Sequence, residues 1–303
     1  MSEFNKLEQY PNIKLNNPSN WNIQGTSIAG ERTGFLLNPL KIILDGGVYS
    51  SVKPIAVFLT HSHCDHTLGL PTLFGPRMNK IKGQEKLMGR PLYLPKLSEY
   101  PVQKLMESAI YLSDNDPNFN SKIDYNIKEN VWKRQGYQPI ISKPGDKFRI
   151  PGLRNIEVEV FKAYHDTESL GYGFNSIKNK LKPEFFYTDD SFKINAKKNG
   201  IDITEEVITP EFVFFCDSSI DNLKNHQEWK KFPVVICECT SFPEMKYNHD
   251  TNHTYFDDLE IIIRSNPEKE WFIIHTSPSL KKVTLSNHQN RLLKDGIKIT
   301  FIR

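Results

Sequence analysis

The segment 55–66, IAVFLTHSHCDH, joins a short apolar run to a cluster of metal-binding side chains. Residues 55–59 have the length and apolar character of a buried strand, so the cluster should lie on the loop at the strand's carboxyl end. Within six residues it holds His61, His63, Asp65 and His66. Imidazoles and a carboxylate suit Zn²⁺, and equally Mn²⁺ or Fe²⁺. The alternative is a His-rich polar loop, but three of the chain's nine histidines would then have gathered here by chance.

Three more ligand-type residues follow apolar strands far away in the sequence. His165 comes after the run 156–161, Asp217 after 212–215, and His275 after 271–274. Each alone could be an ordinary polar residue at a strand end. The repeated placement favours metal binding, and seven ligands suffice for two metals if Asp217 bridges them. Cys64, inside the first cluster, is expected to face outward.

Short apolar runs alternate with helical patterns at 96–112 and 254–264, which indicates a layered α/β architecture. No internal repeat divides the 303 residues, and 38% hydrophobic content is ordinary for a globular chain. The sequence has no run of about 18 apolar residues and no signal pattern at the N-terminus, so we expect no membrane span and an intracellular protein. Four cysteines do not suggest a disulfide framework. The net charge of +3 is too small to indicate nucleic-acid binding by itself.

The ligand pattern resembles the metallo-β-lactamase superfamily and, within it, the tRNase Z (RNase Z) endonucleases, most closely the short plant-type form. The resemblance is carried along most of the chain by Asp45-Gly-Gly47, Ser62, Gly69-Leu-Pro71, Gly171-Tyr172 and the stretch 200–210, GIDITEEVITP. It implies a four-layer αββα sandwich in which 1–303 form a single domain. A basic tRNA-binding arm would be inserted at about 176–199.

The resemblance also implies a role for each site residue. Two Zn²⁺ ions, or Mn²⁺ or Fe²⁺, would be held by two ligand sets: His61, His63, His165 and Asp217, and Asp65, His66, Asp217 and His275. Asp65 would activate the nucleophilic water, and His253 would protonate the departing oxygen. Glu238 would orient His253; the alternative is that Glu238 only caps a turn.

Two lysine-rich stretches are candidates for RNA binding. In the arm these are Lys178, Lys180 and Lys182, and phosphate contacts from lysine give affinity without sequence readout. A second basic stretch consists of Arg77, Lys80, Lys82, Lys86 and Arg90. The alternative for both is a solvated lysine-rich loop.

The sequence departs from the family pattern next to two of the expected ligands. The family follows its last metal histidine with Ser-x-Arg-Tyr, whereas His275 is followed by Thr-Ser-Pro-Ser-Leu280. Cys216 stands where the family has glycine before Asp217. The implied function is a cytoplasmic, homodimeric endoribonuclease that removes the 3′ trailer from precursor tRNA. The alternatives are a phosphodiesterase for another RNA or a small phosphodiester, a thioester or lactone hydrolase, and a non-catalytic RNA-binding relative.

Overall fold

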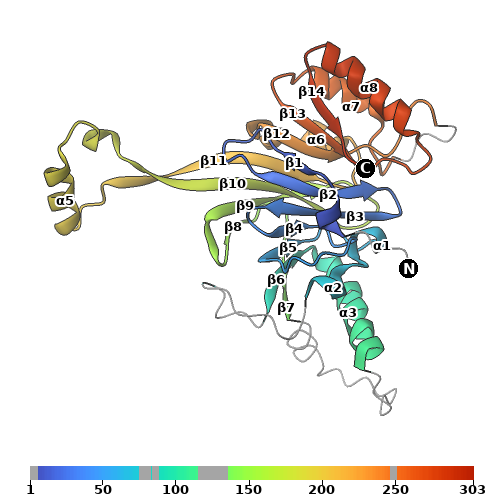
Figure 1. Cartoon of the computed structure of the whole chain (residues 1–303), viewed down its shortest axis with the longest axis horizontal. Coiled ribbons are helices and arrows are strands. Elements are labelled where there is room, and N and C mark those ends of the chain that lie inside the picture. Colours follow the sequence, from blue (N-terminus) through green and yellow to red (C-terminus); the bar gives the residue numbers. More distant parts are fainter. Residues whose placement is uncertain (1–5, 75–82, 84–88, 115–135, 246–250) are drawn as a thin grey trace.

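The structure is a computed structural model that describes residues 6–74, 83, 89–114, 136–245 and 251–303. Two seven-stranded sheets stack face to face, and helices cover their outer faces (Figure 1). The expected four-layer α/β sandwich is therefore confirmed. None of the described helices combines 18 residues with the apolar character needed to cross a membrane.

The first sheet contains the N-terminal strands in sequence order, β1 to β7. Strands β1 to β4 pair antiparallel and β4 to β7 pair parallel. The strands are β1 Asn12–Lys14, β2 Asn22–Ile28, β3 Arg32–Asn38, β4 Ile42–Leu44, β5 Ala56–Phe58, β6 Arg90–Leu94 and β7 Tyr137–Ile141.

The second sheet contains the C-terminal strands, β8 to β14. Strands β8 to β11 pair antiparallel and β11 to β14 pair parallel. The strands are β8 Lys147–Ile150, β9 Leu153–Ala163, β10 Ser169–Leu181, β11 Thr204–Phe215, β12 Val234–Glu238, β13 Glu270–Ile274 and β14 Lys298–Phe301. The carboxyl ends of neighbouring parallel strands lie at the same edge of a sheet. The residues that follow β11, β12 and β13 therefore lie side by side at that edge.

The described helices are short, apart from α3 and α8. They are α1 Cys64–Thr67, α2 Leu70–Leu73, α3 Glu99–Asp114, α5 Asp190–Lys198, α6 Asp221–Asn225, α7 Phe256–Arg264 and α8 Lys282–Lys294. The helix expected at 96–112 begins instead as a 3₁₀ turn, Lys96–Ser98, and continues as α3. Pro101 falls in the first turn of α3, where its missing N–H costs no helical hydrogen bond. The helix expected at 254–264 begins at Phe256.

Apolar side chains fill the spaces between the layers. The central core lies between the two sheets, where the rings of Phe58 and Tyr172 meet at 5.1 Å. A second core joins the C-terminal sheet to α7 and α8, and a third joins the N-terminal sheet to α2 and α3. Packing on both faces makes the sheets rigid, so the loops at their edges start from fixed positions.

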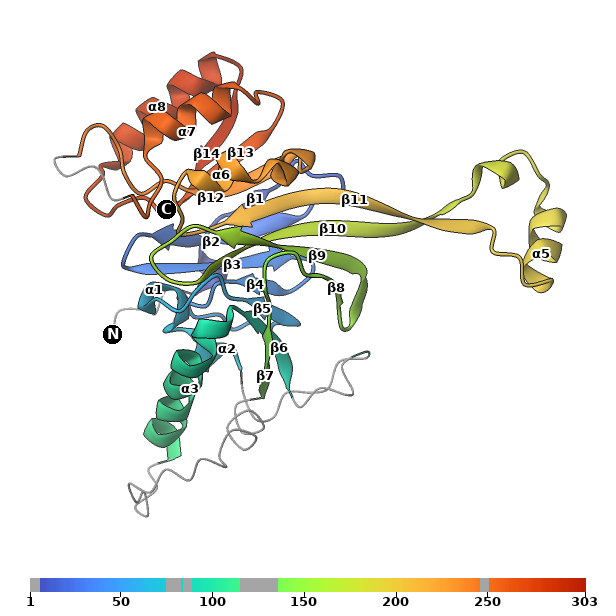
Figure 2. The same ribbon diagram turned by 180° about the vertical axis from the view of Figure 1, so that it is seen from behind.

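Strands β10 and β11 run far beyond their neighbours as a two-stranded ribbon that ends in α5 (Figure 2). At its tip Phe185, Ala196 and Ile203 form a small separate core. Asp189 caps α5, because its carboxylate accepts a hydrogen bond of 2.7 Å from Phe192 N. The segment 176–199, expected as an arm, thus comprises the outer half of β10, a turn and α5.

Candidate metal centre

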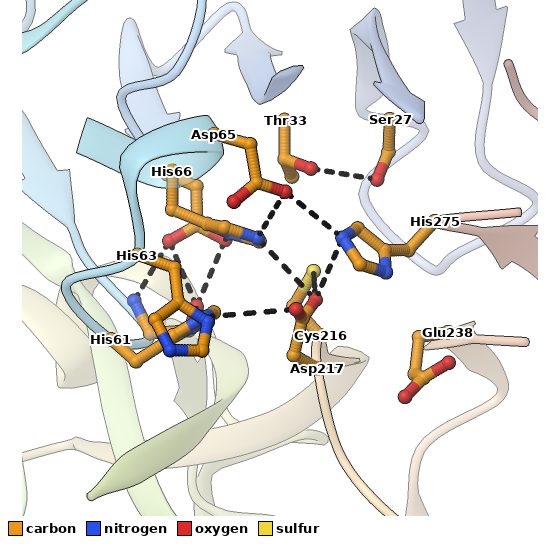
Figure 3. Close-up of polar contacts among 12 residues, drawn as sticks. Ser27, Thr33, His61, His63, Asp65, His66, Cys216, Asp217, Glu238 and His275 are labelled. Carbon is orange, nitrogen blue, oxygen red and sulfur yellow. Dashed lines mark hydrogen bonds and ion pairs between the residues drawn. The ribbon is translucent and has the colours of Figure 1, made fainter. Parts of the chain in front are cut away.

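Ligand-type residues from both sheets meet at one site (Figure 3). His61 follows β5, and Asp217 and His275 follow β11 and β13. His165 follows β9, two residues after the strand ends. The apolar strands therefore bring together side chains that lie more than 200 positions apart in the sequence.

The structure groups the seven expected ligands into two sets that share Asp217. The ligand atoms within each set all lie within 4.8 Å of one another. The first set is His61, His63, His165 and Asp217, and the second is Asp65, His66, Asp217 and His275.

The two carboxylate oxygens of Asp217 face different sets. Oδ2 lies 3.7 Å from His61 Nε2, whereas Oδ1 lies 3.1 Å from His275 Nε2. His66 Nε2 lies 3.4 Å from the same Oδ1. This arrangement is the one a carboxylate needs in order to bridge two cations.

The ring nitrogens that point away from the centre are held by neighbouring side chains. His61 Nδ1 lies 3.0 Å from Thr60 Oγ1, and His66 Nδ1 lies 3.1 Å from Asp45 Oδ2. Thr60 is itself bound to Asp45, to which its N–H donates at 2.8 Å. Such outer contacts fix the orientation of a metal-binding imidazole and leave Nε2 facing the centre.

Asp45 and the two glycines after it pack directly against the turn that carries Asp65 and His66. Asp45 has a φ of 55° and is fully buried. A Cβ on Gly47 would lie 1.7 Å from Asp65 O, so only glycine fits there. Gly46 N donates a hydrogen bond of 2.7 Å to His66 O, which fixes the turn that carries Asp65 and His66.

The protonation and pairing of the centre fit cation binding. Among the described residues, the buried Nε2 atom of His61 has no hydrogen-bond partner, and Nε2 of His66 faces the carboxylates of Asp65 and Asp217 at 3.2 and 3.4 Å. Burial lowers the pKa of His61 well below its usual value, so its ring is neutral and has a lone pair to donate. Burial acts to raise the pKa of Asp217, but the surrounding histidines outweigh it and hold that pKa well below the usual range. Nitrogen and carboxylate donors of this kind suit Zn²⁺, Mn²⁺ and Fe²⁺.

The two cysteines near the ligands differ in their surroundings. Cys64 is exposed, as expected for a residue that faces outward. Cys216 is buried and its thiol donates to Asp217 Oδ1 across 3.4 Å. The Cys216 side chain therefore contacts the carboxylate that the two ligand sets share (Figure 3).

His253 and Glu238 form a pair beside both ligand sets. His253 Nδ1 lies 2.8 Å from Glu238 Oε1, and the His253 ring lies 5.1 Å from the His165 ring and 5.8 Å from the His275 ring. The side chain of His253 keeps 17% of its surface exposed, so a substrate can reach it. Glu238, by contrast, is buried.

Glu238 also binds the backbone around the centre. Its Oε1 accepts from Ser218 N at 2.9 Å, and its Oε2 accepts from Thr240 N at 2.9 Å. Thr240 Oγ1 in turn lies 3.1 Å from His275 Nδ1. The two sequence interpretations of Glu238 are thus compatible, since one carboxylate contacts His253 and holds two turns.

Sequence reasoning gave no role to Asp45, Thr60 or Thr240. Their position could have pointed to the site, because Asp45 directly follows β4 and Thr240 comes two residues after β12. Their function depends on which strands become neighbours, and that is not readable from local pattern.

The candidate RNA-binding lysines lie on the ribbon, away from the centre. Lys178 and Lys180 are exposed on β10, and Lys182 follows the strand half-buried. Lys180 lies opposite Glu205 in the β10–β11 register, which offsets part of its charge. Of the second basic stretch, Arg77, Lys80, Lys82 and Lys86 lie outside the described residues. Arg90 is buried in β6.

Comparison with known proteins finds similarity in sequence to plant tRNase Z and similarity in fold to metallo-β-lactamase fold proteins. No family model matches the sequence. Over 262 residues the chain is 26% identical to tRNase Z TRZ1 of Arabidopsis thaliana, covering 84% of this chain and 85% of that protein. In fold it matches the metallo-β-lactamase fold protein YhfI from Bacillus subtilis, with a TM-score of 0.54, 13% identity, and coverage of 92% and 94%. The chain is thus similar in sequence to plant tRNase Z, and it has the metallo-β-lactamase fold.

Further relatives agree with this assignment. The chloroplastic tRNase Z TRZ2 of Arabidopsis thaliana is 25% identical over 85% of this chain and 68% of that protein. A diphosphatase from the PhnP family shares the fold with a TM-score of 0.52 at 14% identity, over 89% of this chain and 81% of that one. The resemblance expected from the sequence, to the plant-type tRNase Z form, is therefore confirmed.

Proposed function

We propose that the protein is a metal-dependent endoribonuclease that removes the 3′ trailer from precursor tRNA and leaves a 3′-hydroxyl on the tRNA. The observation that carries the proposal is the meeting of two ligand sets on the two oxygens of Asp217, with His253 beside both. The extended similarity to proteins named tRNase Z supports the choice of substrate.

Two divalent ions fit the two ligand sets, and zinc is the proposed metal. When bound, two closely spaced ions supply a water of lowered pKa and neutralise charge on the phosphoryl oxygens. The chain supplies a carboxylate beside that water. Burial acts to raise the pKa of Asp65, but hydrogen bonds from His275 and His66 lower it far below its usual range, so Asp65 is ionised. Its proposed role as proton acceptor rests on its place in the second ligand set.

His253 is proposed to act on the opposite side of the phosphate. As the bond between phosphorus and the departing O3′ breaks, the ring nitrogen opposite Nδ1 donates a proton to that oxygen. Glu238 holds Nδ1 and stabilises the charged imidazole before the transfer. The products are a tRNA with a 3′-hydroxyl and a trailer with a 5′-phosphate.

The ribbon is proposed to bind the tRNA body through Lys178, Lys180 and Lys182. Lysine contacts to phosphates are independent of base sequence, which suits an enzyme that accepts many tRNAs. We also propose, from the family resemblance, that the enzyme is a homodimer of the cytoplasm. The chain would then be one domain with the arm at about 176–199.

Hydrolysis of another RNA or of a small phosphodiester is the second candidate. It is favoured by the loop after His275, which lacks the arginine and tyrosine of the family pattern. The ribbon separates the two candidates, because a small substrate cannot reach it from the metal centre.

The deciding experiment is cleavage of a precursor tRNA that carries a 3′ trailer, with product ends mapped. The wild type should cleave at the trailer junction and lose activity with a chelator. Zinc, manganese and iron should then be added back separately, and elemental analysis should find two transition-metal ions per chain. Asp217→Asn should lose metal and activity, whereas His288→Ala on α8, the control, should keep both. Cleavage that survives complete metal removal, or hydrolysis of bis(p-nitrophenyl) phosphate without any tRNA cleavage, would contradict the proposal.

A further inference from the structure

A pocket of about 410 Å³ lies directly beside the first ligand set, and none of the roles proposed above uses it. His165 forms part of its wall, so the pocket adjoins the first ligand set. The other principal lining residues are Lys162, Tyr164, Glu168, Ser219 and Asp221. Its volume is within the range of pockets that bind a small molecule or a single nucleotide.

Lys162 offers a cation at this pocket. Lys162 and Tyr164 are two positions apart at the end of β9, so they share a face, and Lys162 Nζ lies 4.6 Å from the centre of the Tyr164 ring. Lys162 is exposed, and no carboxylate among the described residues lies within ion-pairing distance of it. Its ammonium group is therefore available to a phosphate.

The wall that carries Tyr164 is held in place. Its backbone N–H donates to Asn222 Oδ1, and its carbonyl oxygen accepts from Ser219 N, both at 2.7 Å. Its ring stacks on His226, with centroids 5.8 Å apart and planes at 30°. These contacts tie the pocket wall to the loop that begins at Asp217, so the pocket and the metal centre keep a fixed relation.

The other polar groups of the pocket suit a nucleoside better than a free anion. Glu168 and Asp221 would repel an isolated phosphate, but carboxylates accept hydrogen bonds from ribose hydroxyls and base amino groups. Glu168 Oε2 already accepts from Leu97 N at 2.6 Å, which fixes the direction of that carboxylate. One cation, one aromatic ring and acceptor groups together match the parts of one nucleotide.

The pocket lies on the side of the proposed proton donor. Asn252, the residue before His253, also lines it, and Asn252 O lies 3.2 Å from His165 Nδ1. The oxygen that His253 would protonate is the O3′ of the last nucleotide of the mature tRNA, so that nucleotide extends from the scissile phosphate toward this side. The loop from His275 to Leu280 contains no cation to hold it.

We propose that Lys162 and Tyr164 form the subsite for the nucleotide on the 5′ side of the cleaved bond, with Lys162 binding that nucleotide's own 5′-phosphate. This inference rests on the proposed function, and it assigns to β9 the phosphate contact that the loop after His275 lacks.

The test pairs enzyme variants with a modified substrate. A precursor tRNA is made with an uncharged methylphosphonate at the phosphate one nucleotide 5′ of the scissile bond, and a control substrate has it three nucleotides into the trailer. Lys162→Ala should raise KM for the unmodified tRNA about tenfold with little change in kcat, because one charge-assisted contact is lost. Lys162→Arg should restore most of the affinity. Lys298→Ala, which removes an exposed lysine on β14, is the matched control and should behave as wild type.

The modified substrate then shows whether Lys162 touches that phosphate. For the wild type, KM should be about tenfold higher on the methylphosphonate substrate than on the unmodified tRNA. For Lys162→Ala, KM should be nearly the same on both substrates. Hydrolysis of bis(p-nitrophenyl) phosphate should be unchanged, because that molecule has no second phosphate.

Three outcomes would overturn the subsite. If the methylphosphonate raises KM by the same factor for the wild type and for Lys162→Ala, then Lys162 does not bind that phosphate. An equal loss on bis(p-nitrophenyl) phosphate means that Lys162 supports the metal centre. If Lys162→Ala cleaves precursor tRNA as the wild type does, the proposed subsite is wrong but the proposed function stands. If the wild type cleaves no precursor tRNA, both proposals are wrong.

Discussion

Replacing Glu238 with glutamine tests whether the buried carboxylate acts in catalysis through His253. Glu238 accepts five hydrogen bonds, from the side chain of His253, the backbone N–H groups of Ser218 and Thr254, and both the N–H and hydroxyl of Thr240. Glutamine keeps the size of the side chain but turns one acceptor oxygen into an NH₂ group and removes the charge. The substitution therefore affects folding and catalysis, and the two effects need separate measurement.

The expected magnitudes follow from these contacts. Loss of a buried, charge-assisted acceptor should lower the free energy of unfolding by about 3 kcal/mol. Loss of the contact that orients a catalytic imidazole should lower kcat roughly 10- to 100-fold. His253→Ala should lower kcat by about 10²- to 10⁴-fold while metal content stays at the wild-type value, because His253 belongs to neither of the two ligand sets that share Asp217.

The double variant decides between the two interpretations. If Glu238 acts through His253, then Glu238→Gln should change kcat less than about threefold when His253 is already alanine. Steady-state cleavage of saturating precursor tRNA gives kcat, urea unfolding gives stability, and elemental analysis confirms that all variants hold metal. Multiplicative losses in the double variant would refute the reasoning, since Glu238 would then act through the fold of the centre and not through the histidine.

Three further predictions concern separate parts of the molecule. Asp65→Ala should abolish cleavage and lower metal content, as elemental analysis and the tRNA assay together would show; retention of both would exclude Asp65 from the centre. Replacing Lys178, Lys180 and Lys182 together with alanine should weaken tRNA binding mainly at low salt, and the slope of log K against log[salt] should become shallower by two to three units, roughly one for each phosphate contact. Hydrolysis of bis(p-nitrophenyl) phosphate should not change, and equal losses on both substrates would place these lysines in the active site instead. Hydrogen bonds from two arginines lower the pKa of Glu260 to about 2, so this group contributes stability above its unfolded pKa of about 4.5 that is lost as pH falls toward 2. Glu260→Gln should therefore cost at most about 1 kcal/mol near neutral pH and only a small part of that at pH 2, and an equal loss at both pH values in urea unfolding would contradict an electrostatic origin.

The strands that lead to the ligands could be predicted, because each contains a short apolar run that is followed by a polar residue. The run 55–59 became β5, and the run 271–274 became most of β13. The same pattern allowed His61, Asp217 and His275 to be proposed as neighbours, since the ends of buried strands collect at one edge of a sheet. The structure places His61 Nε2 3.7 Å and His275 Nε2 3.1 Å from the carboxylate oxygens of Asp217.

The supporting contacts could not be predicted, because they depend on pairing between distant strands. Asp45 reaches His66 and Thr60 only because β4 and β5 lie parallel in register. The thiol contact between Cys216 and Asp217 depends on a side-chain direction that sequence does not give. The pocket at Lys162 requires β9 to end beside the loop after β11, which is set by the order of strands in the sheet.

The continuous strand β11 connects the ribbon tip to the bridging aspartate without a break. It covers the 12 residues Thr204–Phe215, so it rises about 40 Å at roughly 3.3 Å per residue. Adding two residues to both β10 and β11 would displace the tip by about 7 Å and leave every side chain on its present face, whereas adding one would turn the outer lysines to the opposite face. The length of this strand thus sets a minimum size for any molecule that contacts both ends at once, and a dinucleotide falls far below it.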